Sequence, residues 1–141
     1  MAGSLSNSGE ALALNMLFRN TGTSPSAIYL GLITDAAGTL DESSGLADIT
    51  EVDDVGYQRL EVVFDAPSLI SGKQTIQNSS QLEFGPWDSD EDAGITYVFL
   101  CDAASGTTGD ILGLFELPSV KSPLAGESLI VTAGNLSFNI D

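Results

Sequence analysis

The sequence predicts a mainly β protein: an antiparallel β-sandwich or jelly roll with one short N-terminal helix. Short runs rich in Val, Ile, Leu, Phe and Tyr recur along the chain, and Gly, Asn, Asp, Ser and Pro separate them. Only the first of these segments carries helix start and stop signals. The length of 141 residues, of which 43% are hydrophobic, suits one domain over residues 1–141 with a core of its own.

The helix is predicted over about residues 7–19, "NSGEALALNMLFR". Asn7 is favoured over the neighbouring serines as N-cap, because Glu10 then follows at the spacing of a capping box. Leu12 and Met16 place apolar side chains on neighbouring turns, with Leu14, Leu17 and Phe18 as further candidates. The run "RNTG" that follows supplies the stop.

The strands are predicted from apolar or alternating runs. Residues 94–103, "GITYVFLCDA", form the most apolar run, so they are predicted to be the most central strand. Residues 56–64 alternate, which places Tyr57, Arg59 and Glu61 on one face. The predicted strand segments are 26–34, 56–64, 74–77, 80–85, 94–103, 110–118, and one or two strands within 127–140, interrupted at 133–134.

Residues 35–55 break the strand pattern. They are long, acidic and Gly-containing, they hold seven of the 20 acids, and they are predicted to be an excursion from the sandwich. Arg59 sits close by in sequence, and two interpretations of it stay open. It forms an ion pair with Glu61 on an exposed face, or it bonds to a carboxylate of the excursion, Glu51 or Asp53.

The charge balance excludes several classes of partner. Twenty acids stand against four bases, a formal net charge of −16. Direct binding to nucleic acid is excluded because phosphates need Lys and Arg, and anionic membrane surfaces are disfavoured for the same reason. No apolar run is long enough to span a membrane, and no signal peptide is expected. The acidity suits docking on a basic protein surface or a saline habitat.

The sequence predicts no enzyme and no cofactor. It contains no histidine to activate a serine or cysteine, and no phosphate-binding loop. Its single cysteine, Cys101, excludes an internal disulfide and is predicted to be a small buried hydrophobe. A hydrolase acting through paired carboxylates is the last of the alternatives.

Asp88, Asp90 and Asp92 match the spacing of the first three ligands of an EF-hand loop. The sixth position of such a loop requires Gly and the twelfth Glu, but here they are Ala93 and Phe99. The EF-hand is therefore excluded. A solvated turn is the favoured interpretation and a looser calcium site at these three aspartates is the alternative, so no metal is predicted.

Several segments, in order, resemble a family of small virion structural proteins of tailed bacteriophages. These segments are "SNSGEALALNMLF", "PSAIYLGLIT", "EVDDVGYQRLEVVFDAPS", "NSSQLEFGPWDSDEDAGITYVFLCDAASG" and "GDILGLFELPSVKSPLAGESLIVTAGNLSFNID". Such proteins are often labelled tail fibre proteins, and similar small jelly rolls serve as head decoration, or cement, proteins. The resemblance covers nearly the whole chain and implies a virion structural protein.

From the resemblance and the missing active site we predict a capsid decoration protein on the outer capsid surface of the virion. It would bridge and stabilise neighbouring major capsid subunits. Its partners would be the major capsid protein and further copies of itself, in a dimer or trimer. The alternative is a tail fibre or receptor-binding module in which Tyr57, Trp87 or Tyr97 stacks on host surface glycans.

The N-terminal helix and the acidic excursion are the predicted contact surfaces, with Trp87 as a rim aromatic at the end of the sandwich. The predicted partner-contact residues are Leu12, Met16, Arg19, Asp48, Glu51, Asp53, Asp54 and Trp87.

Overall fold

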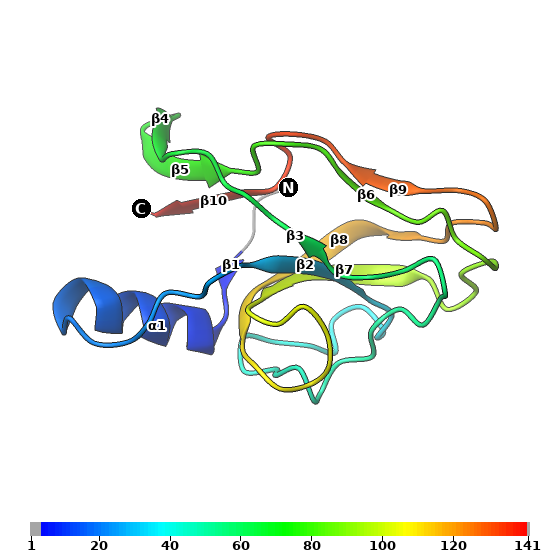
Figure 1. Cartoon of the computed structure of the whole chain (residues 1–141), viewed down its shortest axis with the longest axis horizontal. Helices are drawn as coiled ribbons and strands as arrows, with labels where there is room; N and C mark the ends of the chain where they lie inside the picture. Colours follow the sequence, from blue (N-terminus) through cyan, green and yellow to red (C-terminus); the bar gives the residue numbers. More distant parts are fainter. Residues whose placement is uncertain (1–3, 141) are drawn as a thin grey trace.

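The computed structural model of the chain describes residues 4–140, which form β-strands and one helix (Figure 1). The elements are β1 (Ser4–Leu5), α1 (Asn7–Phe18), β2 (Tyr29–Ile33), β3 (Leu60–Glu61), β4 (Ser68–Ile70), β5 (Lys73–Gln77), β6 (Leu82–Phe84), β7 (Ile95–Cys101), β8 (Ile111–Lys121), β9 (Leu129–Val131) and β10 (Ser137–Ile140). The predicted mainly β fold with one N-terminal helix is confirmed.

The largest sheet has five antiparallel strands in the order β1-β8-β7-β2-β3. β7 lies at its centre and is buried along its whole length. Successive side chains of a strand point to opposite faces. Val98 and Leu100 therefore enter one hydrophobic cluster, and Tyr97 and Phe99 enter a second one on the other face. Burial on both faces explains why this run is the most apolar, and its prediction as the central strand is confirmed.

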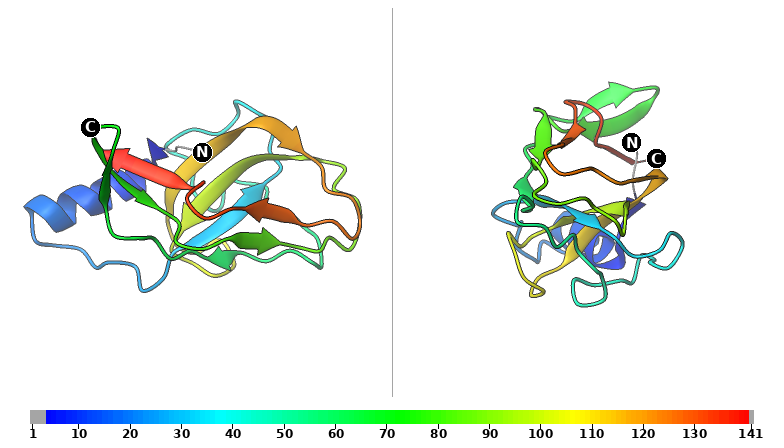
Figure 2. Two further views of the ribbon diagram at one scale, coloured as in Figure 1. Left: turned by 90° about the horizontal axis from the view of Figure 1, so that it is seen from above. Right: turned by 90° about the vertical axis from the view of Figure 1, so that its right-hand side faces the viewer.

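A second layer covers one face of this sheet. It consists of a three-stranded sheet, β10-β5-β4, and a two-stranded sheet, β6-β9 (Figures 1 and 2). The main core lies between the layers, with Leu32 and Phe115 from the large sheet packed in one cluster with Phe84, Val131 and Leu136. This arrangement is a β-sandwich, as predicted.

Residues 35–55 cover the other face of the large sheet as a third layer of irregular chain. Leu46 is buried and Leu40 half-buried against the sheet residues Ile33 and Phe99. The segment also forms an isolated antiparallel bridge to β2. Leu40 and Leu46 are thus part of the fold. Of the seven acids, four are exposed, and Asp35, Glu51 and Asp54 are half-buried.

The N-cap of α1 is Ser6, so the prediction of Asn7 is wrong by one residue. The Ser6 side chain accepts a hydrogen bond from Gly9 N at 3.1 Å, while its own backbone N–H donates to Leu112 O at 3.0 Å. Ser6 caps because pairing with β8 fixes it as the last extended residue. A Cβ on Gly9 would lie 2.3 Å from the Leu112 carbonyl oxygen, so glycine lets α1 start in contact with β8.

The predicted strand 56–64 is largely wrong, because only Leu60–Glu61 pairs as a strand. After β3 the chain leaves β2 and crosses to the second layer, where Asp65 N donates to Gln77 O at 2.8 Å. Its face prediction also fails in part, since Arg59 is 7% exposed while Glu61 is exposed. Residues 56–64 therefore connect two layers of the fold and do not form one continuous strand within a single sheet.

The strand β4 was not predicted from the sequence. Its three residues are all exposed, so they carry no burial pattern to detect. β4 and β5 form a hairpin whose turn residues, Ser71 and Gly72, have φ of 51° and 83°. At the C-terminal end, 127–140 forms two strands, β9 and β10, separated by Gly134 as predicted.

Candidate interaction surface

An apolar groove of about 760 Å³ is lined by α1 and by the sheet β10-β5-β4. These elements lie at one end of the molecule (Figure 1). α1 lines it with Leu12, Ala13 and Met16, which lie on one side of the helix. Ile76 of β5 and Phe138 of β10 line it from the opposite side. The groove exists because α1 packs on β8 only near its start and then runs outward beside the second layer.

A second set of apolar side chains on α1 points away from the groove. Leu14, Leu17 and Phe18 are 57%, 70% and 79% exposed. At 100° per residue these three positions cluster on a face of the helix distinct from that of Leu12 and Met16. α1 is therefore apolar on two faces, which is typical of a helix buried in an assembly and not of a solvent-facing one.

The groove and these outward residues avoid the acidic charge of the chain. They derive mainly from three stretches of sequence, 11–34, 66–82 and 128–140, that contain no Asp or Glu. Glu10, at the start of α1, is the one acid among the described residues that line the groove. We refer to the groove and the three outward residues of α1 together as the acid-poor face. An apolar surface with few charged residues has the composition that is typical of the core of a protein–protein interface.

The predicted contact residues fall into two groups. Leu12 and Met16 line the groove, and Arg19 follows the helix, where its Nη1 donates to Asn15 Oδ1 at 2.9 Å. The others lie outside this surface: Asp48, Glu51, Asp53 and Asp54 in the acidic excursion, and Trp87 in the core.

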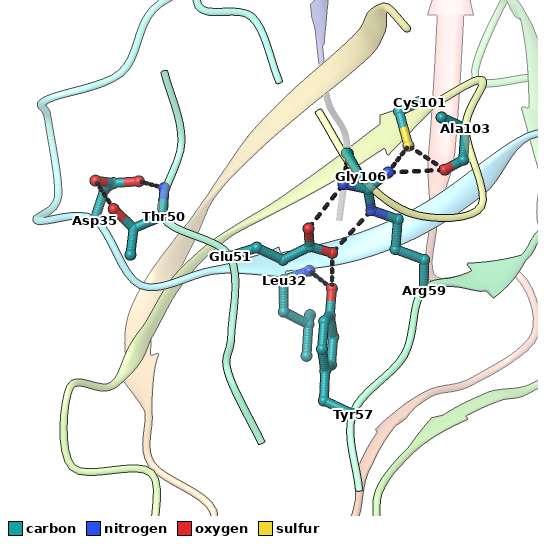
Figure 3. Close-up of polar contacts among 9 residues, drawn as sticks. All are labelled: Leu32, Asp35, Thr50, Glu51, Tyr57, Arg59, Cys101, Ala103 and Gly106. Atoms are coloured by element: carbon teal, nitrogen blue, oxygen red, sulfur yellow. Dashed lines mark hydrogen bonds and ion pairs between the residues drawn. The ribbon is translucent and has the colours of Figure 1, made fainter. Parts of the chain in front are cut away.

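Arg59 is the centre of a buried polar network (Figure 3). Its guanidinium forms a bidentate pair with Glu51, with Nε to Oε1 at 2.8 Å and Nη2 to Oε2 at 2.7 Å. Nη1 donates to Ala103 O at 2.9 Å and to Cys101 Sγ at 3.7 Å, and Nη2 donates to Gly106 O at 2.7 Å. All five N–H donors of the guanidinium thus have acceptors. Of the two interpretations of Arg59, the bond to Glu51 of the excursion is confirmed.

Tyr57 extends this network. Its hydroxyl donates to Glu51 Oε1 at 2.7 Å and accepts from Leu32 N at 2.9 Å. Burial, and then the hydrogen bond to the Glu51 carboxylate, raise the pKa of Tyr57, so the phenol stays protonated. Burial also raises the pKa of the Cys101 thiol. The network thus joins the excursion, the loop after β7 and the edge of the large sheet, and it holds no activated nucleophile.

The acidic turn after Trp87 is held to the excursion by Asp54. The Asp54 carboxylate accepts from Asp88 N at 2.9 Å and from the backbone and hydroxyl of Ser89 at 3.1 and 3.0 Å. These bonds, the one from Asp88 N foremost, lower the pKa of Asp54. Asp90 accepts from Ala125 N at 2.9 Å. Within residues 4–140 no three acidic, His or Cys side chains gather to hold a metal ion, so the carboxylates of Asp88, Asp90 and Asp92 do not converge as three ligands of one ion.

The prediction of Trp87 as a rim aromatic and contact residue is wrong. Its side chain is 2% exposed and packs in the main core. Tyr97 is also 2% exposed, and Tyr57 is half-buried with its hydroxyl engaged as described above. These three side chains do not form the exposed aromatic groove that the glycan-binding alternative required.

The predicted partner-contact residues cover only part of the acid-poor face. They include Leu12 and Met16, but Leu17 and Phe18 were predicted only as apolar residues of the helix, and Phe138 was not singled out. A signal was available in the spacing of the acids, because the three acid-free stretches are long in a chain with 20 acids. That these stretches meet at one end depends on the pairing of β5 with β10, which the sequence did not predict.

Comparison with known proteins identifies one family. A family model described as "Podophage GP4 fiber I protein gp80" matches residues 4–139. A search of curated proteins found no match. Among the residues that the structure describes, no helix is long and apolar enough to cross a membrane.

Proposed function

The chain belongs to the family of podophage GP4 fiber I proteins, and from this premise we propose that it is a non-catalytic fibre subunit, joined to the virion through its acid-poor face. Family membership makes it a phage virion structural protein. The description of the family as fibre proteins favours a fibre over the capsid shell as its place. The acid-poor face is the observation that carries the proposed mode of attachment.

The exposed apolar area supports a role in assembly. Leu17 and Phe18 are 70% and 79% exposed at the end of a helix that also borders a groove of about 760 Å³. Contiguous exposed apolar surface of this kind marks interaction sites on otherwise soluble proteins. Elsewhere the surface carries the acids, which keep the subunit soluble until it is assembled.

The polar groups of the interior support a structural role and not catalysis. The donors of Arg59 are all engaged within the fold, and Cys101 is buried with a raised pKa. Asp54 and Asp90 are acceptors for backbone N–H groups of neighbouring loops. Each of these groups contacts other segments of the chain within the fold, as expected for a rigid structural subunit.

Capsid decoration, the function predicted from the sequence, is the second candidate. It is favoured by the net charge of −16, because an acidic surface can pair with basic patches of the major capsid protein. In that role the excursion acids Asp48 and Asp53, which are exposed, would face the shell.

The copy number per virion tests the proposal. Purified virions are digested and the chain is quantified by mass spectrometry with isotope-labelled peptides, alongside the major capsid protein. A fibre subunit is expected at far fewer copies than the major capsid protein, because fibres attach at a few symmetric positions. A ratio near one would contradict the fibre assignment and support capsid decoration.

A further inference from the structure

A second, smaller groove of about 330 Å³ separates the end of β8 from β9. Residues 121–123 line one side of it and residues 127–130 the other. These segments lie at the end of the molecule away from α1 (Figure 1). The volume is at the lower limit of ligand pockets, about 300–1,000 Å³. The groove therefore suits a narrow segment of chain and not a broad surface.

β9 borders this groove with an open strand edge. It pairs with β6 on one side, and the order of the described strands gives it no partner on the other side. Seen from above, β6 and β8 lie on opposite sides of β9, so the open edge faces the groove (Figure 2). Such an edge presents backbone N–H and C=O groups to which another segment can pair.

The end of β8 does not take the place beside β9. Its register against β7 is irregular, since Tyr97 lies opposite Glu116 but Ile95 lies opposite Lys121. Pro118 lies within this bulged stretch and has no N–H to donate. A bulged stretch that contains a proline is a poor partner for a second strand. The place beside β9 is thus left to a segment from another molecule.

Charge restricts what this segment can be. Four acids surround the groove: Glu83, Asp90, Glu91 and Glu127. Glu127 lines it, Glu83 lies opposite Ile130 in the ladder, and the other two bond to the loop 123–125. Lys121 is the one base among the described residues that line the groove. Bases on the incoming segment are therefore favoured and acids are repelled.

The strand geometry places these bases. Successive side chains of β9 point to opposite faces, so Val131 is buried in the core while Ile130 is 50% exposed beside Glu83. A segment that pairs with β9 needs apolar side chains on the inner face and bases on the outer one. The four bases of this chain lie far apart in sequence, so no short segment of a second copy carries two of them.

We propose that an extended segment of another virion protein, with Lys or Arg alternating with apolar residues, adds to the open edge of β9 as a strand. Residues 124–126, at the tip of the turn before β9, do not line the groove and stay open to solvent. This contact is separate from the acid-poor face. It gives the subunit a second partner, of opposite chemistry, at its other end.

Fluorescence anisotropy with a short labelled peptide of alternating Val and Lys tests the pairing. A matched peptide, N-methylated at every second residue, keeps the charge but loses N–H donors, so it should bind about tenfold more weakly. Ile130→Lys should also weaken binding of the first peptide about tenfold, because a like charge replaces an apolar contact. Equal binding of the two peptides, or unchanged binding by Ile130→Lys, would overturn the inference.

Val63→Lys is the matched control for this variant. It makes the same change of charge at a side chain that is 61% exposed and does not line the groove. It should bind the peptide as the wild type does. If Val63→Lys weakens binding as much as Ile130→Lys, the peptide responds to net charge alone and the site is wrong.

Hydrogen exchange of the wild-type chain locates the contact without any substitution. The unmethylated peptide is expected to slow exchange of the amides of Leu129–Val131 about tenfold. The amides of β4, an edge strand of another sheet, should be unaffected. Protection of β4 instead of β9, or of neither strand, would contradict strand addition at β9.

Photo-crosslinking in purified virions identifies the occupant. A benzoylphenylalanine placed at position 130 is expected to crosslink to a segment of another virion protein that contains Lys or Arg, mapped by mass spectrometry. A crosslink to a second copy of this chain, or no crosslink, would overturn the inference. The copy number of the chain per virion does not depend on this contact, so the inference can fail while the proposed function stands.

Discussion

Replacing Arg59 with alanine is expected to lower the free energy of unfolding by about 3–5 kcal/mol, the usual cost of removing one partner of a buried ion pair. Glu51 would lose both bonds of its bidentate pair while still held against Tyr57. The carbonyl groups of Ala103 and Gly106 would lose their donor as well. Two covering segments, the excursion and the loop after β7, would thereby be detached from the large sheet.

Urea denaturation followed by the fluorescence of Trp87, the single tryptophan, measures this effect. Arg19→Ala is the matched control, because Arg19 is exposed and its side chain bonds only to Asn15 among the described contacts. The control should change stability by less than about 0.5 kcal/mol. Arg59→Lys should recover part of the loss, since lysine keeps the charge but not the planar fork. An Arg59→Ala chain within 1 kcal/mol of the wild type, on the order of the experimental error, would contradict the structural role of the network.

Trp87→Ala is expected to cost about 3–5 kcal/mol, as for other truncations of large aromatic side chains in a core. Trp87 is 2% exposed and belongs to the cluster that joins the two layers of the sandwich. The chain approaches it closely, since a Cβ on Gly85 would lie 2.8 Å from the indole ring. Alanine at position 87 would leave a cavity, and the tightly packed residues around it could not move in to fill it.

Circular dichroism during thermal unfolding measures this loss, because the variant lacks the fluorescent probe. Trp87→Phe is the control. It keeps most of the apolar volume and removes an indole N–H for which the described residues provide no acceptor, so it should cost less than about 1.5 kcal/mol. If Trp87→Ala were as stable as the wild type, Trp87 would be a residue at the rim of the sandwich, as its local sequence predicts, and not a core residue.

The elements that were predicted well carry strong local signals. β7 is a long apolar run because both its faces are buried, and the helix start lies within one residue of its prediction because capping depends on local side chains. The pairing of Arg59 with the excursion was one of two alternatives, and it was recognisable because a base within an apolar, alternating run of sequence needs a carboxylate. Periodicity and local chemistry were sufficient in these cases.

The elements that were predicted poorly depend on contacts distant in sequence. Trp87 follows Gly and Pro and precedes four acids, so its local sequence resembles a surface turn. It is buried because the segments around 54 and 127 close over its turn, through bonds such as Trp87 N to Glu127 O at 2.9 Å. The acid-poor face likewise needs β5 beside β10, more than fifty residues apart along the chain. No local pattern encodes such pairings.

Thiol accessibility in intact virions tests whether the acid-poor face is covered in the assembled phage. The native Cys101 is 0% exposed, so an introduced cysteine is the one accessible thiol. Leu14→Cys places it on the outward side of α1, within the acid-poor face. Leu124→Cys places it on the segment between β8 and β9, which lies at the other end of the molecule (Figure 1). The native side chains are 57% and 54% exposed, so the two sites are matched in the single chain.

Virions carrying either variant are treated with a maleimide, and the rate of labelling is measured by mass spectrometry. If the face is covered, Cys at position 14 is expected to react about tenfold more slowly than Cys at position 124 in virions, and both should react equally fast after denaturation. Equal rates in intact virions would show that the acid-poor face is open to solvent in the phage, and the proposed attachment would then be wrong.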